Sequence, residues 1–198
     1  MRDNNLNIQS DDNELIESFK KGNRYAFNLI VLKYQKKIYW LARKMVLDHD
    51  DADDITQEVF IKLYSSINKY RGESKFFTYL YKIAMNLSLN HLSKNKRNYS
   101  RKVDLNSEAY RISSTEKSSE EFLDEKERKK ILEEAISTLP EQQRAVFNLR
   151  FYDNLSYDEI GKIMKKSTGG MKANYFHAVK KIQEFLKKKK NIKEIISF

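Results

Sequence analysis

Apolar residues recur every three or four positions along residues 12–95, the spacing that places them on one face of an α-helix. The longest stripe runs from Phe27 to Met45, with a shorter stripe before it and two after it. Four packed helices of this kind predict a small bundle. The expected buried residues are Leu15, Ile16, Phe19, Phe27, Ile30, Val31, Tyr34, Ile38, Leu41, Met45, Ile55, Val59, Phe60, Leu63, Phe76, Leu80, Ile83 and Leu87.

Residues 96–119 interrupt this pattern, because they are rich in Ser and Asn and show no sustained apolar period. A segment of this composition is typical of a linker. The stretch reaches roughly 85 Å when fully extended and averages roughly 30 Å as a coil. The linker is therefore expected to tether two units, residues 12–95 and 120–190, without fixing their relative geometry.

Helical patterns resume after the linker and carry start signals. Thr138–Glu141 and Ser156–Glu159 have the spacing of a capping box, and Ser167–Gly170 predicts a turn before a long basic helix. A short helix, a glycine-containing turn and a basic second helix are typical of a helix-turn-helix unit. The predicted fold class is all-α, with an N-terminal helix bundle and a C-terminal helix-turn-helix domain. The expected buried residues here are Ile131, Leu132, Ala135, Ile136, Leu139, Val146, Phe147, Leu149, Phe151, Ile160, Ile163, Met164, Ala173, Phe176, Val179, Ile182 and Leu186.

The composition narrows the class of protein. Only 5 Gly and 1 Pro in 198 residues disfavour turn-rich β folds. The absence of Cys excludes disulfides, thiolate zinc sites and cysteine nucleophiles, and it suits a reducing compartment. The polar N-terminal residues do not form a signal peptide, and no apolar run is long enough to span a bilayer. A cytoplasmic protein without membrane insertion is expected.

Charge is unevenly distributed along the chain. Lys and Arg number 38 against 28 Asp and Glu, a net charge of +10, which predicts a polyanionic partner. The bases gather in residues 69–101 and 167–190, whereas residues 48–58 hold six acids and no base. The basic blocks suit phosphates, and the acidic block must meet a different partner.

The second helix of the helix-turn-helix is the first candidate site. Its lysines suit phosphates, and its Asn suits the N6 and N7 atoms of adenine. The alternative is an ordinary solvated helix hairpin. The candidate residues for duplex DNA are Lys172, Asn174, Tyr175, His177, Lys180 and Lys181.

A second candidate site combines bases with aromatic rings around residues 69–86. Such surfaces suit unpaired bases, which stack on aromatic faces. The alternative is that the rings belong to the core, which we expect for Phe76. Tyr79, Lys82 and Asn86 share a helical stripe, so they are the expected exposed set, together with Arg71 and Lys75.

Catalytic chemistry has no clear candidate in this chain. The Asp residues of 50–54 lack the glycine of a calcium loop, and His49, His91 and His177 are too scattered for a ligand set. We therefore expect no metal site, no cofactor, no catalytic residues and no enzymatic activity.

Three motifs together resemble a known family. They are residues 50–60 (DDADDITQEVF), residues 70–86 (YRGESKFFTYLYKIAMN) and residues 139–160, which contain LPEQQRAVF and LSYDEI. In this order and around a linker, they resemble the extracytoplasmic-function sigma factors. Members of this family are dissociable subunits that direct bacterial RNA polymerase to particular promoters.

The resemblance implies partners and roles. Asp54, Gln57 and Glu58 would meet the clamp helices of the largest polymerase subunit, while the C-terminal domain would meet the flap of the second subunit. Residues 12–95 would bind and melt the −10 element, with the region around Asn86 holding a flipped base. Residues 120–190 would read the −35 duplex. Anti-sigma proteins commonly inhibit family members, but no residue here identifies one.

Three departures from the family pattern affect the DNA contacts. Tyr79 stands where a Trp is common, Gly169-Gly170 replaces a Gly-Thr pair, and Asn174 and His177 occupy positions that are often basic. The −35 preference is therefore open. A stand-alone helix-turn-helix regulator is the main alternative function, and a metal-dependent phosphohydrolase built on the Asp cluster is the third.

Overall fold

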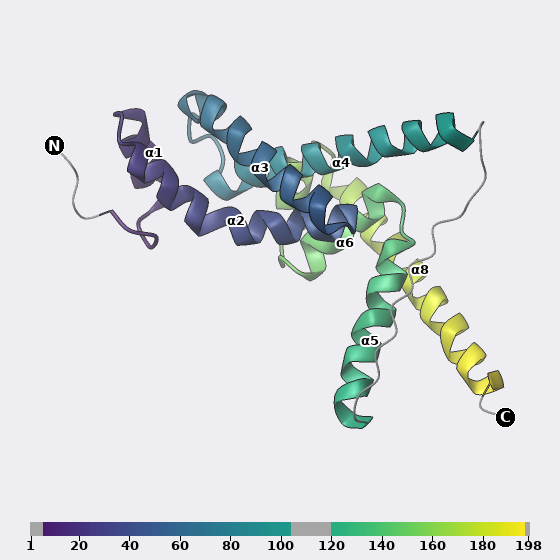
Figure 1. Ribbon diagram of the computed structural model, residues 1–198. Helices are drawn as coiled ribbons and strands as arrows, with labels where there is room; N and C mark the ends of the chain where they lie inside the picture. The colour runs from purple at the N-terminus through teal and green to yellow at the C-terminus, as the bar shows by residue number, and fades with distance from the viewer. Residues whose placement is uncertain (1–5, 104–119, 197–198) are drawn as a thin grey trace.

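The computed structural model describes residues 6–103 and 120–196, with side chains for 6–97 and 127–189. Every regular element in those ranges is a helix, so the predicted all-α class is confirmed (Figure 1). The elements are α1 (Asp12–Lys20), α2 (Arg24–Val46), α3 (His49–Ser66), a 3-10 turn η1 (Ile67–Lys69), α4 (Phe76–Val103), α5 (Glu120–Ser137), α6 (Glu141–Phe151), α7 (Tyr157–Met164) and α8 (Thr168–Ile196).

Helices α1 to α4 form the predicted bundle, with α2 packed against the other three. Short polar side chains begin these helices: the Asp11 and Asn23 side chains each accept a backbone hydrogen bond from the first turn of α1 and α2. All the predicted apolar positions of this unit are buried except Val31 and Ile83, which are half-buried.

Helices α5 to α8 form the second unit, and one of its two predicted capping boxes is wrong. Ser156 and Glu159 make the reciprocal pair of hydrogen bonds at the start of α7, as expected. Thr138 instead donates its hydroxyl to the Ala135 carbonyl at the end of α5, and Pro140 precedes α6 without a side-chain cap. The predicted turn at 167–170 is also shorter, because α8 already begins at Thr168.

The predicted buried face of α8 is only partly correct, because Ile182 is buried and Val179 is half-buried but the other three predicted residues are exposed. Phe176 is 66% exposed, and Ala173 and Leu186 are also exposed. The buried stripe consists of Met171, Ala178 and Ile182. Both stripes have helical spacing, and the choice between them depends on where α6 and α7 lie. The expected burial of Phe151, at the end of α6, is wrong for the same kind of reason: it is exposed.

The two units pack against each other directly, and this contact sets their relative placement in the structure. Helix α7 lies against α4, and α6 lies against the end of α2. Helices α6 and α7 contact the first bundle, and in Figure 1 α5 and the end of α8 project away from it. The first part of the predicted linker, residues 96–103, continues α4 as helix. Residues 104–119 lie outside the described part of the chain.

Candidate nucleic-acid and protein interfaces

The acidic block at the start of α3 divides into two groups of carboxylates. Asp48 caps the helix by accepting a hydrogen bond from the Asp51 backbone N–H at 3.0 Å. Asp51 lies 2.9 Å from the His91 ring, which joins α3 to α4. These two carboxylates therefore stabilise the bundle, and acids in the first turn also suit the helix macrodipole.

The second group faces outward one turn further along α3. Asp54, Gln57 and Glu58 are all exposed, so the structure brings the three predicted residues together on one open face. Glu58 forms an exposed pair with Lys62 at 3.1 Å, which solvent screens. Ile61 continues the same face and is 68% exposed, although the sequence reasoning missed it. Its spacing of three from Glu58 was the available signal.

The stripe on α4 that was expected to be exposed is only partly exposed, and its aromatic member is held in place. The Tyr79 hydroxyl donates to the Ser66 hydroxyl at 2.8 Å, and the Tyr79 ring packs at 5.2 Å from the Tyr70 ring. Tyr79 and Lys82 are half-buried, whereas Asn86 is exposed. A fixed ring that shares a helical stripe with a lysine one turn on and an exposed amide two turns on is suited to stacking and hydrogen bonding with unpaired bases.

Two more predicted residues precede this stripe. Arg71 lies in the loop before α4, next to Gly72, whose φ of +76° belongs to the left-handed region that favours glycine. Lys75 has an 81% exposed side chain and lies 3.7 Å from Glu159 of α7. Both cations are therefore accessible, but Lys75 already contacts the second unit through Glu159.

The predicted face of α8 is only partly correct. Lys172, His177, Lys180 and Lys181 are exposed as expected. Asn174 is half-buried, and its amide donates to the Gly170 carbonyl at 2.8 Å.

The expected exposure of Tyr175 is wrong. Its ring is half-buried, lies 5.9 Å from Phe147 in a stacked geometry and meets Tyr157 edge-on. Phe176, its neighbour in sequence, points to solvent instead. Tyr175 therefore orients α8 on α6 and α7, and the exposed basic face surrounds Phe176.

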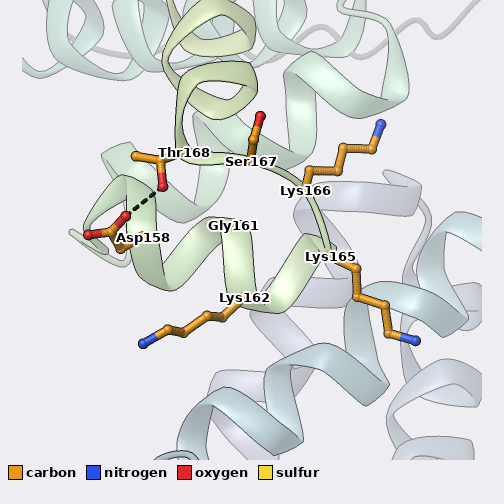
Figure 2. Close-up of a pocket in the computed structure, with 7 residues that line it drawn as sticks. All are labelled: Asp158, Gly161, Lys162, Lys165, Lys166, Ser167 and Thr168. Atoms are coloured by element: carbon orange, nitrogen blue, oxygen red, sulfur yellow. Dashed lines mark hydrogen bonds between the residues drawn. The ribbon is translucent and has the colours of Figure 1, made fainter.

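The turn between α7 and α8 carries lysines that the sequence reasoning missed. Figure 2 shows Lys162, Lys165 and Lys166 around the turn, where they line an open hollow of about 610 Å³. All three are exposed. The signal was available in the sequence, because Lys165-Lys166 directly precedes the predicted turn. These cations extend the basic surface beyond α8.

Close packing explains how the turn is held. A Cβ added at Gly161 would lie 2.7 Å from the Lys166 carbonyl oxygen, closer than real contacts allow. The Thr168 hydroxyl donates to the Asp158 carboxylate at 2.5 Å, which joins the starts of α7 and α8 (Figure 2). Gly161 is therefore needed for the geometry of this helix-turn-helix unit.

The described residues contain no group of three or more metal-ligating His, Cys, Asp or Glu side chains. Within the same ranges, no helix is long and apolar enough to cross a membrane.

Comparison with known proteins identifies related sequences for both units. Residues 30–98 match the family described as Sigma-70 region 2, and residues 129–182 match Sigma-70, region 4. The chain is 36% identical over 178 residues to the ECF RNA polymerase sigma-E factor of Escherichia coli strain K12, covering 87% of this chain and 93% of that protein. It is 34% identical over 186 residues to the RNA polymerase sigma-H factor of Pseudomonas aeruginosa, covering 90% and 95%.

Solved structures share the fold. The sigma factor RpoE of Bartonella quintana, crystallised with the anti-sigma factor NepR, superposes with a TM-score of 0.63 at 21% identity, covering 81% of this chain and 96% of that one. CnrH, solved with the cytosolic domain of CnrY, gives a TM-score of 0.64 at 18% identity and covers 89% and 97%.

Proposed function

The chain belongs to the extracytoplasmic-function sigma factors, and on that basis we propose which of its surfaces meet polymerase and promoter. Members direct core RNA polymerase to promoters, and two matched regions with near full-length relatives support this role over a stand-alone regulator. Below, region 2 denotes α1–α4 and region 4 denotes α5–α8.

The outward face of α3 docks on core polymerase. Asp54, Gln57 and Glu58 form an exposed acidic surface on a protein whose net charge is +10, and this contrast is the observation that carries the proposal. Such a surface has little use against DNA, since like charges repel, but it complements a basic protein partner. The clamp helices of the largest polymerase subunit are the partner that the family resemblance implies. Ile61 would supply an apolar contact beside the charges.

The stripe on α4 takes the −10 element after melting. Flipping a base costs a few kcal/mol, and stacking with a pocket offsets this cost. Tyr79 supplies a pre-oriented ring, and Asn86 supplies an exposed amide about two turns further along the helix. Arg71, Lys75 and Lys82 supply phosphate contacts.

Region 4 binds the −35 duplex through α8 and the turn before it. Lys172, Lys180 and Lys181 are exposed and suit phosphates, whereas His177 and Asn174 are the candidates for base edges. The amide nitrogen of Asn174 is engaged with Gly170, so its oxygen remains for a base donor. Lys162, Lys165 and Lys166 add further positive charge at the turn.

The remaining partners follow from the same role. Region 4 is expected to meet the flap of the second polymerase subunit, and the chain is expected to act in the cytoplasm without catalysing a reaction. An anti-sigma protein is a further expected partner.

Reconstitution tests this function directly. The chain is added to purified core polymerase with genomic DNA, and transcript starts are mapped. We expect discrete starts that share a two-part upstream pattern, because both DNA surfaces select sequence. Starts as scattered as those of core polymerase alone would contradict the proposal.

A further inference from the structure

The loop that joins η1 to α4, residues 70–75, is closed on itself by its first residue. Tyr70 is buried, and its hydroxyl donates to the Ser74 carbonyl at the other end of the loop. Burial raises the pKa of the Tyr70 phenol, so the group keeps its proton at neutral pH and remains a donor. The loop therefore has a defined shape, and it presents Arg71 to solvent.

Four aromatic rings form a row from α2 to the stripe on α4, and Tyr70 supplies the third of them. The Tyr34 ring lies 5.7 Å from the Phe76 ring, which in turn lies 5.7 Å from the Tyr70 ring. The Tyr70 ring lies 5.2 Å from the Tyr79 ring. The position of the Tyr79 ring therefore depends on where the backbone holds Tyr70.

Helix α1 holds this row at two places. At the start of α1, the Asp12 carboxylate accepts a hydrogen bond from the Tyr34 hydroxyl at 2.6 Å. In the last turn of α1, the Lys20 ammonium donates to the Tyr70 carbonyl at 3.0 Å, across 50 positions of sequence. Glu17 lies 2.9 Å from the same ammonium, and the Lys20 side chain is only 25% exposed. Solvent therefore screens this contact less than it screens an open surface pair.

The Lys20 contact fixes one peptide plane of the loop. The Tyr70 carbonyl and the Arg71 N–H belong to the same planar trans peptide, since the described part of the chain contains no cis peptide bond. Rotation of this plane would break a charge-assisted hydrogen bond. The end of α1 therefore sets both the placement of the Tyr70 ring and the direction in which the chain leaves towards Arg71.

We propose that Lys20 is a positioning residue for promoter melting, which acts through the Tyr70 carbonyl to keep the Tyr79 ring oriented for an unpaired base. The inference rests on the proposed function, since that function gives the stripe on α4 its role at the −10 element. Lys20 acts within the protein and makes no contact with DNA in this role. The proposal gives α1, which carries none of the predicted site residues, a part in melting.

Lys20→Met tests the proposal, because Met keeps much of the apolar stem of Lys but lacks the ammonium. The full chain is assembled with core polymerase, and transcription is measured from a linear duplex and from a template already open across the −10 element. We expect Lys20→Met to lose at least about fivefold on the duplex and less than about twofold on the open template. Lys20→Arg should keep at least about half of the natural activity, since a guanidinium also donates to a carbonyl.

Lys21→Met is the matched control, because Lys21 is exposed at the end of the same helix. It should leave transcription from both templates unchanged. Unchanged duplex transcription by a folded Lys20→Met chain would overturn the proposal. Equal losses on the two templates would also overturn it, because they would indicate a general structural role.

A double variant shows whether Lys20 acts through the row of rings. Tyr79→Leu keeps apolar volume on α4 but removes the aromatic face. Lys20→Met should lose less than about twofold when it is added to Tyr79→Leu, because residues that act through one chain of contacts have non-additive effects. A loss of about fivefold in both backgrounds would mean that the ammonium contacts a DNA phosphate directly, which contradicts the positioning role.

Limited proteolysis tests the hold on the loop without polymerase. Trypsin cleaves after Arg71, which is exposed in the loop. We expect this cleavage of the free chain to be at least about threefold faster in Lys20→Met than in Lys21→Met, because the loop opens more often. Equal rates in the two folded variants would refute the hold on the loop. A natural chain that directs no transcription would instead contradict the sigma-factor function, and the cleavage rates would still test the Lys20 contact by themselves.

Discussion

Helices α3 and α8 each bury one face in a core and leave the other exposed for a partner. The two exposed faces differ in charge and in how closely their charged residues are grouped. The α3 face is a compact set, Asp54, Gln57 and Glu58, next to an exposed Ile61. The α8 face is a spread of lysines around an exposed Phe176, and it continues into the turn. A compact acidic set beside an apolar residue favours binding to one complementary protein surface. Dispersed cations favour binding to a polyanion, with an affinity that depends on salt.

The largest expected effect comes from a change that disrupts the α8 face and leaves the α3 face intact. Gly161→Ala places a methyl group 2.7 Å from a backbone oxygen of the turn, so region 4 must shift. We expect a loss of about 1–3 kcal/mol in the free energy of unfolding, measured by denaturant titration, together with loss of −35-dependent transcription. Binding to core polymerase through α3 should remain.

Gly169 provides the matched control for this change. A Cβ at Gly169 meets nothing within 4 Å, and the residue lies in the first turn of α8. Gly169→Ala should therefore leave stability unchanged or raise it by up to about 1 kcal/mol. Equal losses in both variants would mean that the turn tolerates no side chain anywhere, and the specific role of Gly161 would be lost.

The next effect concerns the α4 stripe, which belongs to neither face. Asn86→Ala should lower transcription from a linear duplex at least about tenfold, since the flipped base loses its hydrogen bonds to the amide, and a bidentate amide–base pair contributes about 1–3 kcal/mol. A template already open across the −10 element should lose less than about threefold. Asn28→Ala, an exposed amide on α2, is the control. Equal losses on both templates would remove the melting role of Asn86.

The smallest expected effect tests whether the lysines of α8 bind the phosphates of DNA. Lys172→Ala should flatten the dependence of log affinity on log salt by about 0.9 for −35 DNA, because one phosphate contact is lost. Filter binding of holoenzyme across a salt series measures this slope. Lys21→Ala, an exposed lysine at the end of α1, should leave it unchanged. An unaltered slope in the Lys172 variant would place its side chain away from the DNA.

The same comparison explains how much of the molecule could be predicted from sequence. In α3 the predicted residues Ile55, Val59 and Leu63 are buried, so periodicity identified the buried side of the helix. The outward residues Asp54, Gln57 and Glu58 were expected from the family resemblance. In α8 the apolar residues occupy two neighbouring stripes, and Phe176 made the wrong one look buried. Periodicity measures spacing, but only the positions of α6 and α7 decide which stripe is covered.

Contacts between residues far apart in the sequence could likewise not be predicted from the spacing of apolar residues. The ring stack between Tyr175 and Phe147 depends on two helices meeting, and so does the contact of Asn148 with Lys44 across the two regions. The Thr138 capping box failed because the preceding helix uses that hydroxyl at its own C-terminal end. Local signals predicted elements well, whereas contacts between elements set the finer assignments.

The central claim is that the outward acids of α3 anchor this subunit to polymerase. The affinity of labelled chain for purified core polymerase tests it, with Asp54→Lys/Glu58→Lys compared against Glu14→Lys/Glu184→Lys. The second pair carries the same charge change at exposed sites on α1 and α8. We predict at least about a 30-fold loss for the α3 pair, corresponding to about 2 kcal/mol, and less than threefold for the control. Unchanged affinity of the folded α3 variant would contradict the account.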